Sequence, residues 1–307
     1  MVQGPPNQRL HVRHLTRYRY HRPVRFGEHR LMVRPRDSHD LRLLDASLRI
    51  NVPCELRWMH DVFGNSVAVA DFNEASDVLE FESSIVIDRY PLQRGPLAIE
   101  AFAQTLPFSY PLSEIPDLGR TIERHYADPE RKVTEWTRRF LAPVGGVIET
   151  ETFLLSLTEA IRNEMRYETR YDPGVQTAVE TLERQAGSCR DYAVLMMEAV
   201  RSVGLAARFV SGYLYDPAID GGPSDITGAG ATHAWMEIYL PGAGWVEFDP
   251  TNGSAGGRNL VRVAVAREPA QAMPISGSYE GSSTDFADLE VSVEVRALDP
   301  ASQHQAA

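Results

Sequence analysis

The chain has 307 residues, of which 43% are hydrophobic and 24% are charged, as in an ordinary globular protein of one or two domains. Its formal net charge of -11 argues against a general nucleic-acid binder, because such proteins present a basic surface. No run approaches the roughly 20 consecutive apolar residues that a membrane-spanning helix needs. We therefore expect neither a nucleic-acid partner nor a membrane partner.

Cysteine use and the first residues both bear on location. Cys54 and Cys189 are the only cysteines, which is few for a secreted protein of this length and typical of a reducing compartment. Residues 1–7 are polar and proline-rich, and they lack the apolar core of a signal peptide. We expect a cytoplasmic location.

The first third of the chain has the pattern of short β-strands. Apolar and polar residues alternate in segments that Pro23, Gly27 and Pro35 separate, and residues 61–66 have the composition of a hairpin turn. Further β-favouring segments follow at 48–52, 56–60, 67–70 and 79–87. The pattern predicts an all-β sandwich domain, which we place at residues 1–95.

A proline-rich connector over residues 89–113 separates this domain from a region with helical periodicity. Apolar residues three and four apart predict helices over 118–126, 133–141, 151–165 and 191–203. Strands are predicted over 207–215, 233–240, 245–249, 261–266 and 289–295. We assign residues 96–298 to one α+β core and residues 299–307 to a disordered tail.

Residues 216–231, between two predicted strands, are rich in Gly and Pro. The segment is long for a connection without secondary structure, which favours a mobile active-site loop. It lacks the Gly-Lys-Ser/Thr ending of a phosphate-binding loop, so we do not expect a nucleotide.

Cys189 stands at the predicted start of a buried helix, after Gly187 and Ser188. The free backbone N–H groups and the positive end of the helix dipole favour a thiolate there. Most lone cysteines are small core residues, which is our interpretation of Cys54. A catalytic role for Cys189 therefore needs a base and a group that orients the base.

His233 and Asp249 are the candidates for these two roles. His233 opens a predicted strand directly after the 216–231 loop, and residues 241–244 have the composition of a turn. If the strands on either side of the turn pair antiparallel, Asp249 lies opposite a residue within about three positions of His233. Each residue alone is more often structural; their joint placement with the thiol predicts a Cys–His–Asp triad.

Three motifs in this order resemble those of the transglutaminase-like superfamily. They are Gly-Ser-Cys-Arg-Asp-Tyr-Ala at 187–193, His-Ala-Trp at 233–235 and Glu-Phe-Asp-Pro-Thr at 247–251. The likeness covers roughly residues 151–252. Upstream, His-Leu-Thr-Arg-Tyr-Arg-Tyr at 14–20, followed by Pro-Arg at 35–36, resembles the N-terminal β region of many bacterial members.

The resemblance implies a papain-like α+β core, with the cysteine helix packed against an antiparallel sheet that carries the histidine and the aspartate. By position, Cys189 is the nucleophile, His233 the general base and acid, and Asp249 the orienting carboxylate. Animal cross-linking members have Gln and Trp beside the cysteine, where this chain has Ser188 and Arg190. We interpret Arg190 and Asp191 as structural.

We expect no cofactor and no metal site, because the chain has no CxxC, HExxH or EF-hand calcium motif. The expected partner is a peptide or protein amide substrate, and the oligomeric state stays open. Beside the backbone N–H of Cys189, a second group should donate a hydrogen bond to the oxyanion of the intermediate, and the identity of that group also stays open. Cys189 is expected to react with iodoacetamide well below about pH 8.5, the pKa of a free thiol, and far faster than Cys54.

Three functions are compatible with these residues. We favour hydrolysis of an amide or peptide through a thioester intermediate, because nothing marks a dedicated amine-binding site. Amine incorporation or cross-linking, as by a protein-glutamine gamma-glutamyltransferase, uses the same residues and stays open. The third function is a catalytically inactive scaffold in which the β domain or the 216–231 loop binds a protein; an intact triad argues against it.

Overall fold

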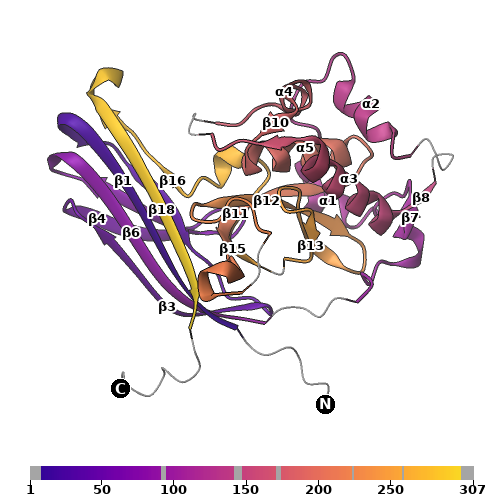
Figure 1. The fold of residues 1–307 in the computed structure, drawn as a ribbon, viewed down its shortest axis with the longest axis horizontal. Coiled ribbons are helices and arrows are strands. Elements are labelled where there is room, and N and C mark those ends of the chain that lie inside the picture. The colour runs from indigo at the N-terminus through magenta and orange to yellow at the C-terminus, as the bar shows by residue number, and fades with distance from the viewer. Residues whose placement is uncertain are drawn as a thin grey trace.

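The computed structural model describes residues 8–90, 95–141, 147–170, 174–222, 225–257 and 259–298. A region of long β-strands lies beside a mixed core of helices and strands (Figure 1). The expected tail, 299–307, lies outside the described residues. In the described ranges, no helix combines the length and the apolar character needed to cross a membrane.

The β region consists of two antiparallel sheets. In one, β1 lies between β6 and the C-terminal strands β17 and β18, and β3 forms the far edge; in the other, the order is β16-β2-β5-β4. The bounds are β1 Gln8–Phe26, β2 His29–Arg34, β3 Leu41–Ile50, β4 Cys54–His60, β5 Ser66–Phe72, β6 Ala75–Arg89, β16 Ile275–Ser276, β17 Tyr279–Glu280 and β18 Phe286–Ala297.

Alternation of apolar and polar residues explains how the sheets pack. Side chains from both sheets, among them Phe26, Leu31 and Phe81, form one buried cluster. Pro23 was expected to end a strand, but β1 continues through it. The pairing of β1 with β6 is interrupted between Arg19 and Val24, so the missing N–H of Pro23 falls in the gap.

The predicted boundary between the domains is wrong at the C-terminal end. We assigned residues up to 298 to the core, but β18 pairs with β1 from Leu10 to Tyr20, and β16 and β17 pair with β2 and β1. The alternation in the sequence marks a strand over these residues without indicating its partner. The N-terminal β region is therefore completed by the last strands of the chain.

The core is built on a five-stranded antiparallel sheet in the order β14-β13-β12-β11-β15, covered by helix α5. The strands are β11 Ala207–Leu214, β12 His233–Leu240, β13 Gly244–Asp249, β14 Ser254–Ala255 and β15 Leu260–Ala266. The helices are α1 Ile115–Leu118, α2 Lys132–Arg138, α3 Thr150–Glu164, α4 Ala178–Arg184 and α5 Cys189–Arg201.

Short elements complete the chain and connect the larger ones. The two-residue strands are β7 Thr105–Leu106, β8 Ile148–Glu149, β9 Arg166–Tyr167 and β10 Ala186–Gly187. The 3-10 turns are η1 Ala101–Ala103, η2 Gly119–Thr121, η4 Pro217–Asp220, η5 Pro269–Gln271 and η6 Ser283–Asp285.

One predicted helix, over residues 118–126, is wrong. Only α1 and η2 form there, and the backbone N–H groups of His125 and Tyr126 donate to the carboxylate of Glu198, at 3.1 and 3.4 Å. Glu198 lies on α5 and is fully buried. A buried carboxylate needs donors, and these backbone groups supply them at the expense of a helix.

The β region and the core share a hydrophobic interface. Side chains of β1 and β6, such as Leu10 and Ile87, pack against Tyr213 and Val261 of the core sheet. Asn65 adds two hydrogen bonds across it, since its Nδ2 donates to the Val265 carbonyl at 2.7 Å and its Oδ1 accepts from the Val265 N–H at 2.9 Å.

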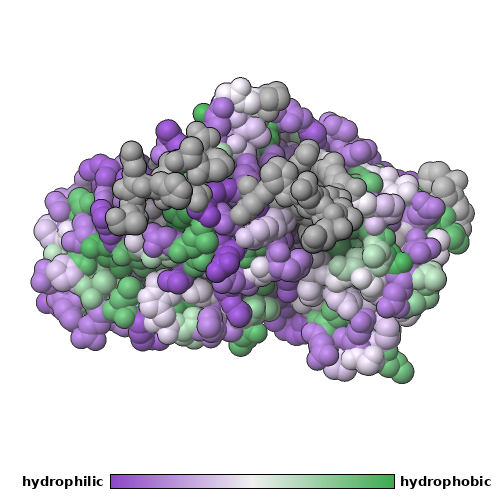
Figure 2. Space-filling view, turned by 90° about the horizontal axis from the view of Figure 1, so that it is seen from below, coloured by the Kyte–Doolittle hydropathy of each residue, from purple (hydrophilic) through white to green (hydrophobic). Residues whose placement is uncertain are grey.

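The surface of the β region includes exposed apolar side chains on its edge strands. Leu44 of β3 and Leu56 and Trp58 of β4 are each more than one third exposed. Viewed from below, hydrophobic residues gather on the side of the β region within a largely hydrophilic surface (Figure 2).

Gly212 allows the core sheet to close tightly beside the predicted site. It pairs with His233 across β11 and β12, and the pairing of β11 with β15 shifts register between Ser211 and Gly212. A Cβ at Gly212 would lie 2.1 Å from the Val261 carbonyl oxygen and 2.8 Å from the Trp235 ring. Only glycine permits this approach.

Candidate active site

Cys189 is the first residue of α5, as predicted, and Ser188 is its N-cap. The carboxylate of Asp191 accepts hydrogen bonds from both the backbone N–H and the hydroxyl of Ser188, each at 2.8 Å. This capping arrangement fixes the turn that carries the thiol. The thiol itself is almost buried, since Cys189 is 8% exposed.

Asp191 also binds residues from the segment that precedes α4. Its carboxylate pairs with the Arg170 guanidinium at 2.8 Å and accepts from the Gln176 N–H at 2.7 Å. Arg190 donates to the carbonyl of Arg170 at 3.1 Å. These contacts match the structural interpretation of Arg190 and Asp191.

The β12–β13 hairpin brings His233 and Asp249 together. Met236 pairs with Phe248, so Asp249 continues the ladder at the level of Trp235, two positions from His233. The imidazole Nε2 lies 2.8 Å from Asp249 Oδ2. Because Asp249 occupies Nε2, Nδ1 is the nitrogen left for the thiol. In the described part of the chain, Nδ1 makes no hydrogen bond.

Burial and charge act in opposite directions on this pair. Burial lowers the pKa of His233, but the Asp249 carboxylate raises it by more. The Cys189 side chain raises it further, and the resulting pKa is about 10. Burial alone would raise the pKa of Asp249; the imidazole of His233 and the amide of Asn252 outweigh it and hold that pKa below its usual range. The arrangement favours an imidazolium beside a carboxylate.

Tyr167 lies at the thiol, although its sequence position gave no sign of it. β9 runs parallel to β10, which pairs Tyr167 with Gly187, two residues before the cysteine. Burial raises the pKa of Tyr167, and the Cys189 side chain raises it further. Twenty-two residues separate the two in sequence, so only the tertiary fold reveals the contact.

Asn252 and Trp235 complete the surroundings of the histidine–aspartate pair. Asn252 Nδ2 donates to Asp249 Oδ2 at 2.8 Å. The ring of Trp235 stacks on that of His233, with centroids 5.9 Å apart, and is fully buried. We had not identified Asn252, although its position in Asp249-Pro250-Thr251-Asn252 is the signal of a turn that folds back onto the aspartate.

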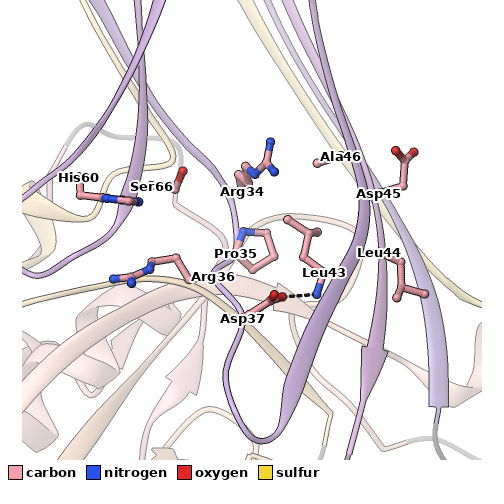
Figure 3. A pocket seen from close by; sticks show the side chains of 10 residues that line it. All are labelled: Arg34, Pro35, Arg36, Asp37, Leu43, Leu44, Asp45, Ala46, His60 and Ser66. Atoms are coloured by element: carbon pink, nitrogen blue, oxygen red, sulfur yellow. Dashed lines mark hydrogen bonds between the residues drawn. The ribbon is translucent and has the colours of Figure 1, made fainter.

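The other chemically notable groups lie away from this site. Cys54 is half-buried in β4, where burial raises the pKa of its thiol. A pocket of about 480 Å³ opens between the strands of the β region, lined by Arg34, Arg36, Leu43 and His60 among others (Figure 3). Within the described ranges, no group of three or more His, Cys, Asp or Glu side chains is placed to hold a metal ion.

Relatives of known sequence span almost the whole chain. An uncharacterized protein of Mycobacterium tuberculosis is 28% identical over 300 residues, which is 93% of this chain and 92% of that protein. A protein-glutamine gamma-glutamyltransferase of Pseudomonas aeruginosa is 33% identical over 69 residues, which is 22% of this chain and 10% of that protein.

Among solved structures, a candidate cysteine protease from Cytophaga hutchinsonii has the same fold. It superposes with a TM-score of 0.68 at 20% identity, covering 96% of this chain and 92% of that one. The expected fold, an α+β core of the transglutaminase-like type preceded by a β region, is confirmed.

Family models match both parts of the chain and together cover more than half of it. The model of the transglutaminase-like superfamily matches residues 140–250, which include all three predicted triad residues. The model of the bacterial transglutaminase-like N-terminal region matches residues 10–88, within the β region. The chain therefore contains a transglutaminase-like core together with the bacterial N-terminal region of that superfamily.

Proposed function

We propose that this protein cleaves or transfers at an amide carbonyl through a Cys189–His233–Asp249 triad. The observation that carries the proposal is the 2.8 Å contact between His233 Nε2 and Asp249 Oδ2, which leaves Nδ1 for a thiol at a helix N-terminus. A helix N-terminus and an adjacent imidazolium both stabilise a thiolate. Asp249 keeps the imidazole oriented and protonated.

The reaction has two steps that return the enzyme to its starting state. The Cys189 thiolate adds to the carbonyl carbon, and the C–N bond breaks as His233 gives its proton to the leaving nitrogen, which forms a thioester. In the second step His233 takes a proton from water, the oxygen attacks the thioester, and the thiolate leaves as the carboxylic acid forms. The substrate is a glutamine carboxamide or a peptide bond.

Hydrolysis and amine transfer differ only in the nucleophile of the second step. We favour water, because nothing in the sequence marks a site for a second, amine substrate. The partial match to a protein-glutamine gamma-glutamyltransferase supports amine transfer as the second candidate. In that reaction a primary amine attacks the same thioester, and His233 takes a proton from the amine.

A glutamine-containing peptide offered together with a labelled primary amine tests both candidates. We expect ammonia release to exceed label incorporation, and Cys189→Ala to abolish both without unfolding the protein. Incorporation that exceeds hydrolysis would replace the first candidate with the second. Equal, slow iodoacetamide labelling of Cys189 and Cys54, with no turnover of the peptide, would instead support a binding scaffold.

A further inference from the structure

Residues 225–231, here called the cover, lie against the groups that flank the thiol. Gly228 has a φ of 91°, and a Cβ built on it would lie 3.3 Å from the Tyr167 hydroxyl oxygen and 3.5 Å from His233 Nδ1. Cys189 raises the pKa of both of these side chains, and it is itself only 8% exposed. An acyl group that reaches the thiol has to displace this backbone.

Asn252 binds the cover and the triad at the same time. Its Oδ1 accepts from the backbone N–H of Thr227 at 2.8 Å, and its Nδ2 donates to the Thr227 carbonyl at 3.3 Å. The same Nδ2 donates at 2.8 Å to Asp249 Oδ2, the oxygen that also contacts His233. One carboxamide therefore joins the backbone of the cover to the orienting carboxylate.

The cover has other attachments, and these do not involve the triad. Asp225 pairs with Arg162 of α3 at 3.2 Å, and the two side chains are 86% and 39% exposed. The Gly230 carbonyl accepts from the N–H of Val293 in β18 at 3.0 Å. An exposed pair of this kind contributes little to stability, whereas the Asn252 contacts join the cover directly to Asp249.

We propose that Asn252 is a positioning residue that latches the cover over the thiol and orients Asp249. With the latch formed, Asp249 is held for His233 and the thiol is covered. When substrate displaces the cover, Asn252 loses Thr227 but keeps Asp249. Substrate binding therefore works against the latch, whereas the chemical step depends on the Asn252–Asp249 contact. The second part of this inference rests on the proposed triad.

Replacement of Asn252 should separate access to the thiol from turnover. In Asn252→Ala we expect faster alkylation of Cys189 by iodoacetamide, because the cover opens more often. KM for the glutamine peptide should fall, since the closed form no longer competes with substrate. The kcat should fall on the order of tenfold or more, because Asp249 loses a donor that orients it. A merely structural role would not lower KM.

Three controls make the comparison specific. Asn252→Asp keeps the size and the acceptor for the Thr227 N–H but cannot donate to Asp249. Its kcat should therefore fall as in Asn252→Ala, whereas alkylation of Cys189 should rise less than in that variant. Asp225→Ala removes the exposed attachment and should leave alkylation and kcat within about twofold of wild type. The rate at which iodoacetamide alkylates Cys54, measured in the same samples, should be unchanged in each variant. An unchanged rate excludes general unfolding.

Alkylation of Cys189 in Asn252→Ala at the wild-type rate would overturn the latch, whatever the turnover. A wild-type kcat in either Asn252 variant would overturn the positioning role. Failure of the proposed function has a different signature: Cys189→Ala would retain turnover, or wild-type Cys189 would react no faster than Cys54 at neutral pH. The alkylation comparison tests the latch even in that case.

Discussion

At the scale of single residues, Asp249 sets the charge of His233. Burial lowers the pKa of His233 and the carboxylate raises it to about 10, so Asp249→Asn should bring that pKa down. In this variant His233 loses its proton at a lower pH than in the wild type. We therefore expect the fall of kcat/KM on the alkaline side of its pH profile to move from near pH 10 toward neutral pH. The kcat should fall by roughly 10²–10⁴. A pH profile of kcat/KM for a glutamine peptide measures both.

The matched control is Asp285→Asn, which also removes an ion-paired carboxylate. Asp285 binds Arg22 at 2.7 Å in the β region, away from the triad. This variant should keep the wild-type alkaline limb. If the alkaline limb of kcat/KM stayed at the wild-type pH in Asp249→Asn, a group other than His233 would govern that limb.

The placement of Cys189, His233 and Asp249 in the fold could be predicted because each has a local signal. Cys189 follows a turn of small residues at a helix start, and the short turn between two strands fixes the register of Asp249 against His233. Tyr167 and Asn252 differ, because their roles arise from contacts that only the folded chain makes. A pairing of two-residue strands brings in Tyr167, and a turn after Asp249 brings in Asn252.

At the scale of elements, Asp191 anchors the start of α5 more strongly than a capping residue normally does. It is fully buried and accepts from Ser188, Gln176 and Arg170. Asp191→Ala removes the buried acceptor that these donors share, so the free energy of unfolding should fall by about 2–4 kcal/mol. Urea denaturation measures the change.

The start of α4 offers a matched comparison for this prediction. Glu180 accepts from the Thr177 N–H in the same kind of capping box, but in an exposed position. Glu180→Ala should cost no more than about 1 kcal/mol. If Asp191→Ala and Glu180→Ala lost the same free energy of unfolding, Asp191 would contribute no more than an ordinary capping residue.

Elements with their own periodicity were predictable, and elements decided by distant partners were not. The apolar spacing in α3 and α5 is sufficient to mark both helices. Residues 118–126 have similar spacing, yet the buried Glu198 binds their backbone N–H groups instead. The strand β18 was expected, but its pairing with β1 depends on a partner more than 250 residues away.

At the scale of the whole molecule, one cation joins the β region to the core sheet. The Arg262 guanidinium on β15 lies 3.2 Å from both Glu237 and Glu247 and 3.4 Å from Asp40, which precedes β3. Burial raises the pKa of Glu247, Arg262 opposes this rise and the neighbouring Glu237 adds to it, with the net result that the pKa is about 7. Together with Arg208, which pairs with Glu237 at 2.5 Å, this guanidinium allows two carboxylates to be buried side by side.

Arg262→Met should destabilise the protein in a pH-dependent way. Above neutral pH the variant keeps two buried carboxylates without their shared cation, and the free energy of unfolding should fall by about 3–5 kcal/mol. As the pH falls to about 5, Glu247 binds a proton in the folded state while it stays charged in the unfolded chain, so part of this loss is recovered. Urea denaturation at about pH 8 and about pH 5 gives the two values.

An exposed ion pair serves as the control for this experiment. Arg138 and Glu135 on α2 are 2.8 Å apart, and both side chains are more than half exposed. Arg138→Ala should therefore change the free energy of unfolding by no more than about 0.5 kcal/mol at either pH. If Arg262→Met lost the same stability at both pH values, Glu247 would not be the group that titrates. A loss of no more than about 0.5 kcal/mol at both pH values would instead mean that the coupling between the β region and the core rests on the hydrophobic interface of β1 and β6 with the core sheet.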